Sequence, residues 1–462
     1  MQEVDMKREK QVEQLDIISN LPDHIIAHII SFLPTEEAIR TSILSSKWKY
    51  LWKGISSVSL QGTQSDPDRF ANLVEHVLNN CKSTNFLSIN LSCPDNIGLS
   101  RINAWISTAL SCKIEKLLLY FRKYFPDRSE PPLPKCVLDC STLIVLKLDS
   151  YFDLCIPESI VCFPHLKLLD FNVILPDQDR VMHQLLSSCP VLEELSVSCL
   201  LDFCKVRKIN ICIPTLKKLR LCLEYSKEGE YDVLIDTPNL EYLYIEDDSL
   251  SRYVMKNLSR LHHVEITYDV ICVESVETKH KNSILQLLNG IAATDVMTLH
   301  HPTSSVLGSA CSHTWPTFSN LRMLEINLTD ETGWTCFPRV LHSTPNLLVL
   351  ILDLGRMNTT YPYDRNPCTW APLDSVPICL LENLKVIGVK WFAGFEDEVE
   401  AVEYLLKNAK VLERMMINSY PLDDEVVDKL LMCPTASEIC DVQFYDNIFF
   451  QISPIKISVW GI

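Results

Sequence analysis

Histidine and cysteine are the side chains of this sequence that could bind a metal ion, and four of them lie near one another: His300, His301, Cys311 and His313. Imidazole nitrogens and thiolates are ligands that zinc prefers. The spacing of these four matches no zinc-binding pattern, and they fall where the apolar periodicity of the chain lapses. We therefore predict a solvated loop at these residues and no metal site.

Other patterns that carry enzyme chemistry do not occur in the sequence. The chain has 19 cysteines but no C-x-x-C pair, and it contains no G-x-G-x-x-G, G-x-x-x-x-G-K-[ST], G-x-S-x-G or H-E-x-x-H. Scattered cysteines in a chain without a secretion signal are typical of reduced, buried small side chains. We expect a protein that is not an enzyme, with no catalytic residues and no cofactor.

Charge and hydropathy narrow the possible partners and the compartment. The formal net charge is -17, which weighs against nucleic acid as a general partner because phosphate binding depends on clustered Lys and Arg. Met1 to Asp16 is charged throughout and lacks the apolar core of a signal peptide, and no later apolar run approaches a membrane span. We expect an intracellular protein of the cytoplasm or nucleus that binds neither nucleic acid nor membrane.

A loose L-x-x-L-x-L pattern recurs along most of the 462 residues. Within the first continuous run, successive copies start 21 to 26 residues apart, in the range of leucine-rich repeats, where each unit supplies one short strand and a return segment. Such units stack into a solenoid with a parallel sheet on the concave face. The copies start at Leu143, Leu166, Leu192, Leu216, Leu240 and Leu261, then at Leu321, Leu347, Leu384 and Leu412, with weaker copies at Phe86 and Ile114.

The return segments are predicted to be helical where they are long enough. Asp179 to Cys189 has one apolar stripe at helical spacing. Regular repeats place an Asn or Cys three residues after the last apolar strand position, but this sequence has other residues there, among them Glu224, Asp248 and Gly355. We therefore expect an irregular solenoid.

Residues between the leucines should point away from the core because side chains alternate along a strand. Positively and negatively charged side chains are mixed on this predicted concave face. At each position the alternative to a binding residue is an ordinary solvated surface residue. One basic cluster is predicted, from Lys217, Lys218 and Arg220 with Lys205, Arg207 and Lys208. If the face binds a target, the residues we expect to do so are Lys218, Arg220, Tyr242, Tyr244 and Glu246, with the tyrosines as anchors, rather than the Pro-rich insertion at 353–377.

Near the N-terminus, Leu21 to Trp52 reads LPDHIIAHIISFLPTEEAIRTSILSSKWKYLW. Pro22 suits a first helical position, Pro34 ends the first helix, and Thr35 is a good N-cap for the second. Three short helices over so few residues cannot bury all of these apolar groups among themselves. The surplus fits either a partner surface or a cap folded onto the first repeat.

This segment resembles an F-box in its LP start, its Ile-rich first helix, its LP break, its S-x-L-S-x-x-W stretch and its closing LW. The resemblance implies that the segment binds an SKP-type adaptor and, through it, a cullin. The side chains that it assigns to the adaptor are Leu21, Pro22, Ile25, Ile26, Ile29, Leu33, Pro34, Ile43, Leu44 and Trp48.

Residues 379–417 contain two strand-like triplets that flank an amphipathic helix. Val399, Val402, Leu405, Leu406 and Ala409 line one helix face, and Glu403 precedes Lys407 by one turn. This block resembles the FBD module of plant F-box proteins, including its Trp391 to Gly394 turn and its NAKVLERM stretch.

These features predict an α/β repeat protein: a flexible N-terminus at 1–15, an all-α F-box at 16–56, leucine-rich repeats at 57–378, an FBD module at 379–446 and a tail at 447–462. The resemblance implies a substrate-recognition subunit of an SKP-cullin-F-box ubiquitin ligase, with an unidentified protein substrate on the repeats. Two alternatives stay open: a receptor whose repeats hold a small ligand, and an adaptor-binding protein without a role in degradation.

Overall fold

A computed structural model of the chain separates into two compact units, one formed by the residues up to Ser150 except 130–133, the other by those four residues and Tyr151–Ile462. None of the helices in the described part of the chain is long and apolar enough to cross a membrane. The structure describes residues 21–81, 87–121, 135–153, 162–174, 180–200, 208–224, 231–248, 251–268, 278–300, 303–309, 315–328, 331–355, 375–419 and 424–445.

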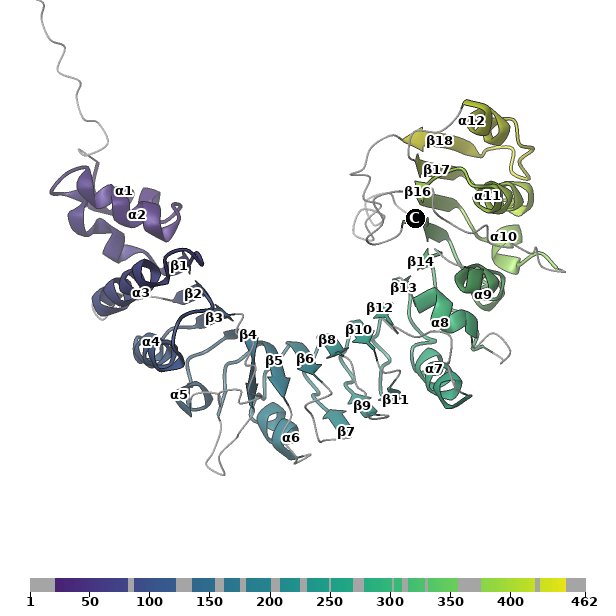
Figure 1. Ribbon diagram of the computed structural model, residues 1–462. Helices are drawn as coiled ribbons and strands as arrows, with labels where there is room; N and C mark the ends of the chain where they lie inside the picture. Colours follow the sequence, from purple (N-terminus) through teal and green to yellow (C-terminus); the bar gives the residue numbers. More distant parts are fainter. Residues whose placement is uncertain are drawn as a thin grey trace, which may run out of the picture. The chain divides into compact units, whose positions relative to one another are not determined.

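The first unit begins with four short helical segments and continues as strands that alternate with helices (Figure 1). Its helical segments are α1 (Asp23–Ile30), α2 (Thr35–Arg40), η1 (Thr41–Ile43) and η2 (Trp48–Gly54), followed by α3 (Pro67–Cys81), α4 (Leu99–Ser111) and α5 (Lys135–Leu138). Its strands are β1 (Ser57–Gln61), β2 (Ser88–Cys93), β3 (Lys116–Phe121) and β4 (Val145–Asp153), whose last three residues fall in the second unit.

Pro22 stands one position earlier than predicted, as the N-cap of α1, and Pro34, predicted to end the first helix, is the N-cap of α2. Pro22 and Pro34 precede their helices, with their carbonyl groups accepting the first backbone hydrogen bonds. Thr35 is therefore the first residue of α2 and not its N-cap. Its buried hydroxyl instead accepts a hydrogen bond of 2.8 Å from the backbone amide of Ser59, which attaches α2 to β1.

Strands β1 to β4 form a parallel sheet in sequence order, with the predicted leucine positions in register. Leu117 is aligned with Ile89 and Leu146, and the three side chains are at most 1% exposed. β1 was not predicted as a repeat, yet its Val58 is aligned with Ile89 in the same buried row. Phe86, the predicted start of one weak copy, lies outside the described residues.

The second unit repeats the same parallel arrangement along its main sheet, in the order β5-β6-β8-β10-β12-β13-β14-β15-β16-β17-β18. The bounds of these strands are β5 (Leu168–Ile174), β6 (Glu194–Leu200), β8 (Lys218–Glu224), β10 (Tyr242–Asp247), β12 (His263–Thr267), β13 (Val296–Leu299), β14 (Met323–Asn327), β15 (Val349–Asp353), β16 (Val386–Phe392), β17 (Arg414–Ser419) and β18 (Asp441–Tyr445).

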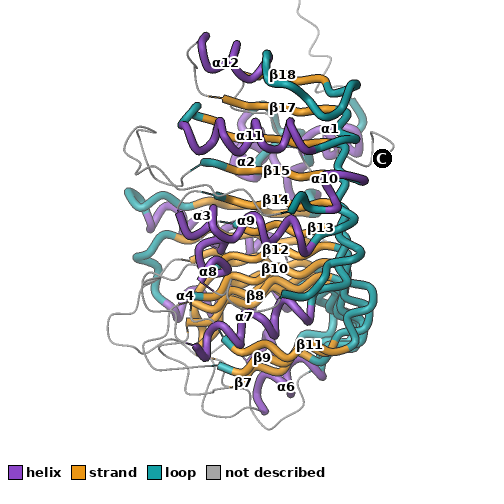
Figure 2. Tube along the Cα trace, turned by 90° about the vertical axis from the view of Figure 1, so that its right-hand side faces the viewer, coloured by secondary structure: helices purple, strands orange, loops and turns teal. Residues whose placement is uncertain are grey.

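One face of this sheet is covered by the return segments (Figures 1 and 2). Three of these segments contain short strands, which pair into a second parallel sheet in the order β11-β9-β7. The helices are α6 (Arg180–Ser187), α7 (Thr278–Gly290), α8 (Thr303–Ser309), α9 (Glu331–Ser343), α10 (Ile378–Glu382), α11 (Glu396–Asn408) and α12 (Asp424–Leu431), and the strands are β7 (Lys208–Ile211), β9 (Asp232–Asp236) and β11 (Arg252–Lys256).

The helical prediction, made for return segments that are long enough, is thus confirmed for α6, whereas three other return segments contain strands. Their side chains alternate, with Ile209, Val233 and Tyr253 at most 2% exposed. A strand needs fewer residues than a helix to cross the same distance, because it advances about twice as far per residue. Short return segments therefore suit strands.

The predicted leucine register is correct along the main sheet. Leu219, Leu243 and Val264 are aligned across β8, β10 and β12, and all three are fully buried. The gap in the pattern between Leu261 and Leu321 contains a further strand, β13, which aligns Met297 with Val264. The repeat is therefore continuous where the sequence pattern lapses.

A row of side-chain hydrogen bonds joins successive turns, at a position different from that of regular repeats. An Asn or Thr directly before the first leucine of a unit donates to a backbone carbonyl of the preceding turn. The donors and acceptors are Thr142 to Ile114, Thr215 to Leu192, Asn239 to Pro214, Asn320 to Ala293, Asn346 to Ser319 and Asn383 to Pro345, at 2.7 to 3.2 Å.

The last part of the second unit has the strand-helix-strand order predicted for residues 379–417. The predicted apolar face of α11 is buried, and Lys407 lies 2.6 Å from Glu403. At the turn before α11, Trp391 and Gly394 have positive φ angles of 60° and 80°. The buried carboxylate of Glu398 accepts hydrogen bonds from the amides of Ala393 and Gly394, which holds this turn against the start of the helix.

Candidate functional site

The helical segments at the start of the first unit expose a group of large apolar side chains. Ile43 is 86% exposed, Phe32 75% and Leu44 64%, although large aliphatic and aromatic side chains are ordinarily buried. The adaptor residues predicted from the sequence that the structure leaves exposed are Pro22, Ile25, Ile29, Leu33, Pro34, Ile43 and Leu44, while Leu21 is half-buried.

Two of the predicted adaptor residues lie inside the helical bundle. Ile26 is fully buried and Trp48 is 5% exposed, together with Ile30 and Trp52. Ile26 and Ile30 are one turn apart on α1, and α1 packs against η2, which carries both tryptophans. Ile26 and Trp48 therefore hold the bundle together and do not belong to its exposed surface.

Two exposed aromatic side chains were missed in the sequence. Phe32 packs edge-on against His28 with ring centroids 4.9 Å apart, and Tyr50 is 59% exposed beside the ammonium groups of Lys49 and Lys53. Phe32 directly precedes the LP break at Leu33 and Pro34, and Tyr50 lies two residues after Trp48. With Ile25, Ile29, Leu33, Ile43 and Leu44, these two residues form what we term the bundle surface.

In the second unit, the five predicted target-binding residues lie together on the open face, defined as the face of the main sheet opposite its helices. Tyr242 is aligned with Lys218 and Tyr244 with Arg220 on neighbouring strands. The lysine and arginine are exposed, and the two tyrosines and Glu246 are half-buried. The alternation of side chains along a strand thus correctly predicted the face on which these five residues lie.

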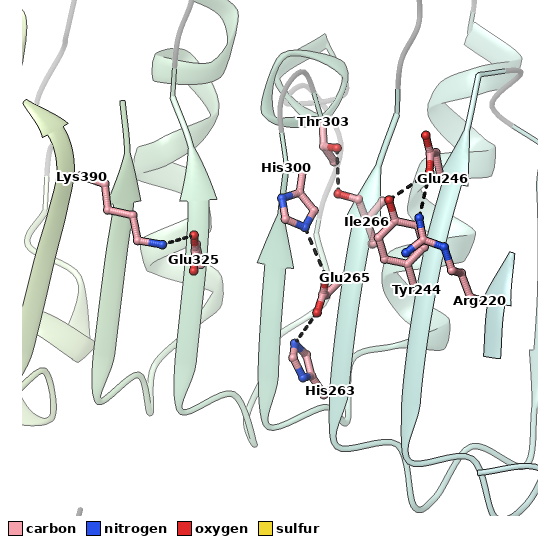
Figure 3. Close-up of polar contacts among 10 residues, drawn as sticks. All are labelled: Arg220, Tyr244, Glu246, His263, Glu265, Ile266, His300, Thr303, Glu325 and Lys390. Atoms are coloured by element: carbon pink, nitrogen blue, oxygen red, sulfur yellow. Dashed lines mark hydrogen bonds and ion pairs between the residues drawn. The ribbon is translucent and has the colours of Figure 1, made fainter. Parts of the chain in front are cut away.

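Arg220, Tyr244 and Glu246 form one contact group (Figure 3). The guanidinium carbon of Arg220 lies 3.8 Å above the centre of the Tyr244 ring, and one of its nitrogens is 3.5 Å from the Glu246 carboxylate. The Tyr244 hydroxyl donates a hydrogen bond of 3.0 Å to the same carboxylate. These contacts hold the tyrosine in one orientation before any partner binds, which lowers the entropy cost of binding.

A second contact group, on the next strands, was not predicted. The carboxylate of Glu265 lies 3.3 Å from His300 and 3.3 Å from His263, the latter without the alignment of a hydrogen bond (Figure 3). The His263 ring also meets the Tyr242 ring edge to face, with centroids 5.1 Å apart. The hydrogen bond from His300 holds the pKa of Glu265 below its usual value, whereas burial lowers the pKa of His263.

The structure corrects part of the loop predicted around His300, because residues 303–309 form helix α8. His300 directly follows β13, and the start of α8 is attached to β12 beside it by the Thr303 hydroxyl, which donates to the Ile266 carbonyl at 3.0 Å (Figure 3). His301, Cys311 and His313 lie outside the described residues. Within the described ranges, no group of three or more His, Cys, Asp or Glu is arranged to hold a metal ion.

The predicted basic cluster does not form as one patch. Lys208 begins β7 in the second sheet, whereas Lys218 and Arg220 lie on β8 in the main sheet. Lys217 and Lys218 are each paired with a glutamate, at 2.9 and 2.8 Å. Lys205 and Arg207 lie outside the described residues. The open face around β8 is therefore of mixed charge.

The prediction that the thiols are small buried side chains is confirmed for part of the described cysteines, among them Cys189, Cys222 and Cys379, and is wrong for Cys162 and Cys212, which are exposed. Burial raises the pKa of Cys222, on the open face beside Arg220, to about 11, and that of Cys379 to about 11. Burial likewise raises the pKa of Cys189 to about 12. Thiols with such pKa values stay protonated near neutral pH and are poor nucleophiles.

Further along the same sheet, the open face changes from polar to apolar. Met416 lies between two apolar positions of the repeat that starts at Leu412, so the alternation along a strand predicted it on the surface of this face. It is only 2% exposed, and that prediction is wrong. It belongs to a cluster that we term the apolar patch, spread over β14 to β17. The patch consists of Met323, Val349, Ile351, Val386 and Met416, with Val296, Leu348 and Tyr445 packed against it.

A charged pair borders the apolar patch. Lys390 on β16 reaches across β15 to Glu325 on β14, with the two charged groups 2.5 Å apart and less than a fifth of each side chain exposed (Figure 3). Asp353 lies near both, and burial raises the pKa of its carboxyl above the usual value. The polar part of the open face, from β8 to β12, thus ends in partly buried charges next to the apolar patch.

Comparison with protein families places known domains on these regions. The family described as "F-box domain" matches residues 18–59, which include the bundle surface. The leucine-rich repeats of "FBD-associated F-box protein At5g56370" match residues 102–266, which include β8, β10 and all but the last residue of β12. The family described as "FBD" matches residues 372–417, a range that ends within β17.

Proteins of Arabidopsis thaliana are similar to this chain over nearly its whole length. F-box/LRR-repeat protein At4g14096 is 31% identical, over 94% of this chain and 96% of the relative. F-box/FBD/LRR-repeat protein At5g22660 is 27% identical, over 92% of this chain and 96% of the relative. The three domain matches in this order, together with similarity of this extent, show that the chain belongs to the plant F-box/FBD/LRR-repeat protein family.

Proposed function

We propose that this protein is the substrate-recognition subunit of an SKP-cullin-F-box ubiquitin ligase, located in the cytoplasm or nucleus. In this role the F-box binds an SKP-type adaptor and, through it, a cullin, while the repeats hold a target protein. The observation that carries the proposal is the bundle surface, since an F-box with this much exposed apolar side-chain area supports a protein interface.

The mechanism would be proximity. Tethering a target beside a charged conjugating enzyme raises the effective concentration of its lysine side chains. Ubiquitin transfer itself would be performed by other subunits. The residues of this chain would contribute two binding interfaces and no reacting group.

The polar open face supports the target-binding half of the proposal. Tyr242 and Tyr244 are half-buried and pack against the His263 ring and the Arg220 guanidinium group, respectively. Lys218 and Arg220 beside them are exposed. Aromatic side chains that are already oriented bury a large area at a low entropy cost, which is typical of interface anchors. We propose Lys218, Arg220, Tyr242, Tyr244 and Glu246 as the centre of the target site.

Adaptor binding can be tested with substitutions that spare the fold. Ile43→Asp combined with Leu44→Asp changes two exposed side chains, so the bundle should stay folded. A lost interface anchor commonly costs about 2 kcal/mol or more, so we expect adaptor affinity to fall at least about thirtyfold. The measurement is calorimetric titration of purified adaptor, with Ser57→Asp combined with Gln61→Asp, two exposed positions on β1, as the control of equal charge.

Trp48→Ala separates stability from binding in the same experiment. This side chain is buried, so its truncation should cost about 3 to 5 kcal/mol of stability and weaken adaptor binding only through loss of the fold. Unchanged adaptor affinity in the folded Ile43→Asp, Leu44→Asp variant would overturn the proposed interface. Adaptor binding without cullin recruitment would favour the non-degradative alternative.

A further inference from the structure

The two contact groups of the open face share one feature, a tyrosine hydroxyl that donates a hydrogen bond to a glutamate. In the first group Tyr244 donates to Glu246 at 3.0 Å. In the second group Glu265 accepts hydrogen bonds from His300 and from Tyr242, and both lower the pKa of its carboxyl. Each tyrosine ring therefore has a carboxylate at its hydroxyl end.

In the first contact group the ring and the carboxylate hold a guanidinium group (Figure 3). The guanidinium carbon of Arg220 lies 3.8 Å from the centre of the Tyr244 ring, and one of its nitrogens lies 3.5 Å from the Glu246 carboxylate. A planar guanidinium suits such a place because it stacks on aromatic rings and pairs with carboxylates. The first group thus shows, within the chain itself, which chemistry a tyrosine and a glutamate accommodate on this face.

The second contact group has a ring and a carboxylate in the same relation. The Tyr242 ring meets the His263 ring edge to face, with centroids 5.1 Å apart. The Glu265 carboxylate lies 3.3 Å from a ring nitrogen of His263 and 3.3 Å from one of His300. Within the described ranges, the partners of Glu265 are therefore two imidazoles and a phenol, and no lysine or arginine is among them.

Three other glutamates of the open face each lie beside a cation of the same chain. The pairs are Glu194 with Lys218 at 2.8 Å, Glu246 with Arg220 at 3.5 Å and Glu325 with Lys390 at 2.5 Å. This pairing reduces the repulsion that Lys218 and Arg220 exert on an incoming positive charge. A cation from a partner would complete the second contact group in the way that Arg220 completes the first.

The charge and the exposure of the second contact group also suit a cation. Burial lowers the pKa of His263, but the carboxylates of Glu265 and Glu325 raise it, so their field attracts positive charge to this ring. The side chains of Glu265 and His300 are 23% and 37% exposed, which leaves the carboxylate accessible but partly shielded from water. Partial shielding makes a charge pair stronger than it is at fully exposed positions.

We infer that the target protein inserts an arginine side chain at the second contact group, where the guanidinium packs against the Tyr242 and His263 rings and pairs with the Glu265 carboxylate. This inference rests on the proposed target site and adds the chemistry that the site recognises. Lysine should fit less well, because a compact ammonium group neither stacks on a ring nor pairs with a carboxylate through two parallel hydrogen bonds.

Peptide selection on the full chain tests the inference. A phage-displayed library of random peptides is selected on wild type, on Glu265→Gln and on a Tyr242→Ala, Tyr244→Ala variant. Glu241→Gln, at the exposed position directly before β10, is the control that makes the same chemical change outside the contact groups. The enriched peptides are synthesised with arginine, with lysine, or with citrulline, which has nearly the same shape as arginine but no charge. Calorimetry measures the affinity of each peptide for each protein.

We expect wild type and Glu241→Gln to enrich peptides that share an arginine at one position. Citrulline at that position should weaken binding to wild type about tenfold or more, and lysine should weaken it by a smaller factor. Glu265→Gln should bind the arginine and citrulline peptides within about twofold of each other, because the pair that distinguishes them is gone. Thermal unfolding verifies that Glu265→Gln is folded, and the citrulline comparison on wild type needs no variant.

The possible failures separate the inference from the proposed target site. Peptides that require the two tyrosines but bind equally well with citrulline would overturn the inference and leave the target site in place. An equal loss on citrulline replacement in wild type and in folded Glu265→Gln would also overturn it, since the guanidinium would then lie elsewhere. If wild type enriches no peptide, or only peptides that the tyrosine variant binds as tightly, the target site itself is wrong, and the inference with it.

Discussion

Two parts of one sheet in the second unit are built on the same leucine register and present opposite surfaces. In β10, β12 and the first half of β8, buried positions alternate with half-buried or exposed ones, and the open face carries Arg220, Tyr244 and Glu265. In β15 the first four residues, Val349 to Leu352, are all buried. Alternating buried and exposed positions are typical of a sheet that has one face in solvent. A continuous apolar run is typical of a sheet that is covered on both faces. One repeat architecture thus provides both a polar binding surface and a covered apolar one.

The leucine register is the feature that the two parts share, and it gives the largest expected effect. Leu219→Asp places an unpaired carboxylate at a fully buried position of β8, which should cost more than about 4 kcal/mol and unfold a contiguous stretch of repeats. Lys218→Asp changes the neighbouring exposed position and serves as the control. Thermal unfolding followed by circular dichroism measures both variants, and an unaltered melting temperature for Leu219→Asp would show that the register is wrong.

The second test compares open-face positions between the two parts. Ile351→Ala, in the apolar patch, should lower the free energy of unfolding by about 2 to 4 kcal/mol, since the side chain is fully enclosed. Tyr244→Ala, at the half-buried end of the same face, should cost less than about 1.5 kcal/mol. Urea denaturation measures both. Equal costs would remove the distinction between a covered and an open surface.

The smallest expected effect is a pH dependence confined to the polar part. Burial lowers the pKa of His263 below its ordinary value of 6.5, and the nearby His300 lowers it further. The carboxylates of Glu265 and Glu325 raise this pKa, but by less. The unfolded chain therefore takes up this proton more readily, so the stability present above pH 6.5 is lost as the pH falls below it. Glu265, whose pKa is lowered, adds a similar loss below its ordinary value of 4.5.

We expect the free energy of unfolding in urea to fall between pH 7 and pH 5, and His263→Gln to reduce that fall. His262→Gln is the neighbouring control, since His262 is an exposed residue paired with Asp295. A fall of equal size in wild type and His263→Gln would show that His263 does not contribute to it.

Much of the fold could be predicted from the sequence because leucine spacing and helix periodicity are local signals. The register of β8, β10 and β12 and the apolar face of α11 followed from them. β13 was missed because Thr294 stands where other units have their first leucine. Thr294 is nevertheless fully buried, and its hydroxyl donates to the carbonyl of His262 at 2.8 Å, so a polar residue fills an apolar position.

The candidate sites were predicted only in part because exposure depends on packing between elements. The motif at 21–52 does not distinguish Ile26, which is buried, from Ile25 and Ile29, which are on the surface. The Asn and Thr residues that join successive turns are visible in the sequence as a repeated N-L or T-L pair. The prediction considered only an Asn or Cys three residues after the last apolar strand position, so it did not include this pair. The contact of His300 with Glu265 joins residues far apart in sequence, and no local pattern indicates it.

The central claim is that two separate surfaces of this chain bind two different proteins, and affinity capture from cells with blocked proteasomes tests it most directly. Captures of wild type, the Ile43→Asp, Leu44→Asp variant and a Tyr242→Ala, Tyr244→Ala variant are compared by quantitative mass spectrometry, with deletion of 356–374 as the control for the insertion. We expect the first variant to lose adaptor and cullin while it keeps the target, and the second to lose the target while it keeps the adaptor. The insertion deletion should keep both. A folded tyrosine variant that retains the target, with loss of the target on deletion of 356–374, would contradict the account and place recognition in the insertion.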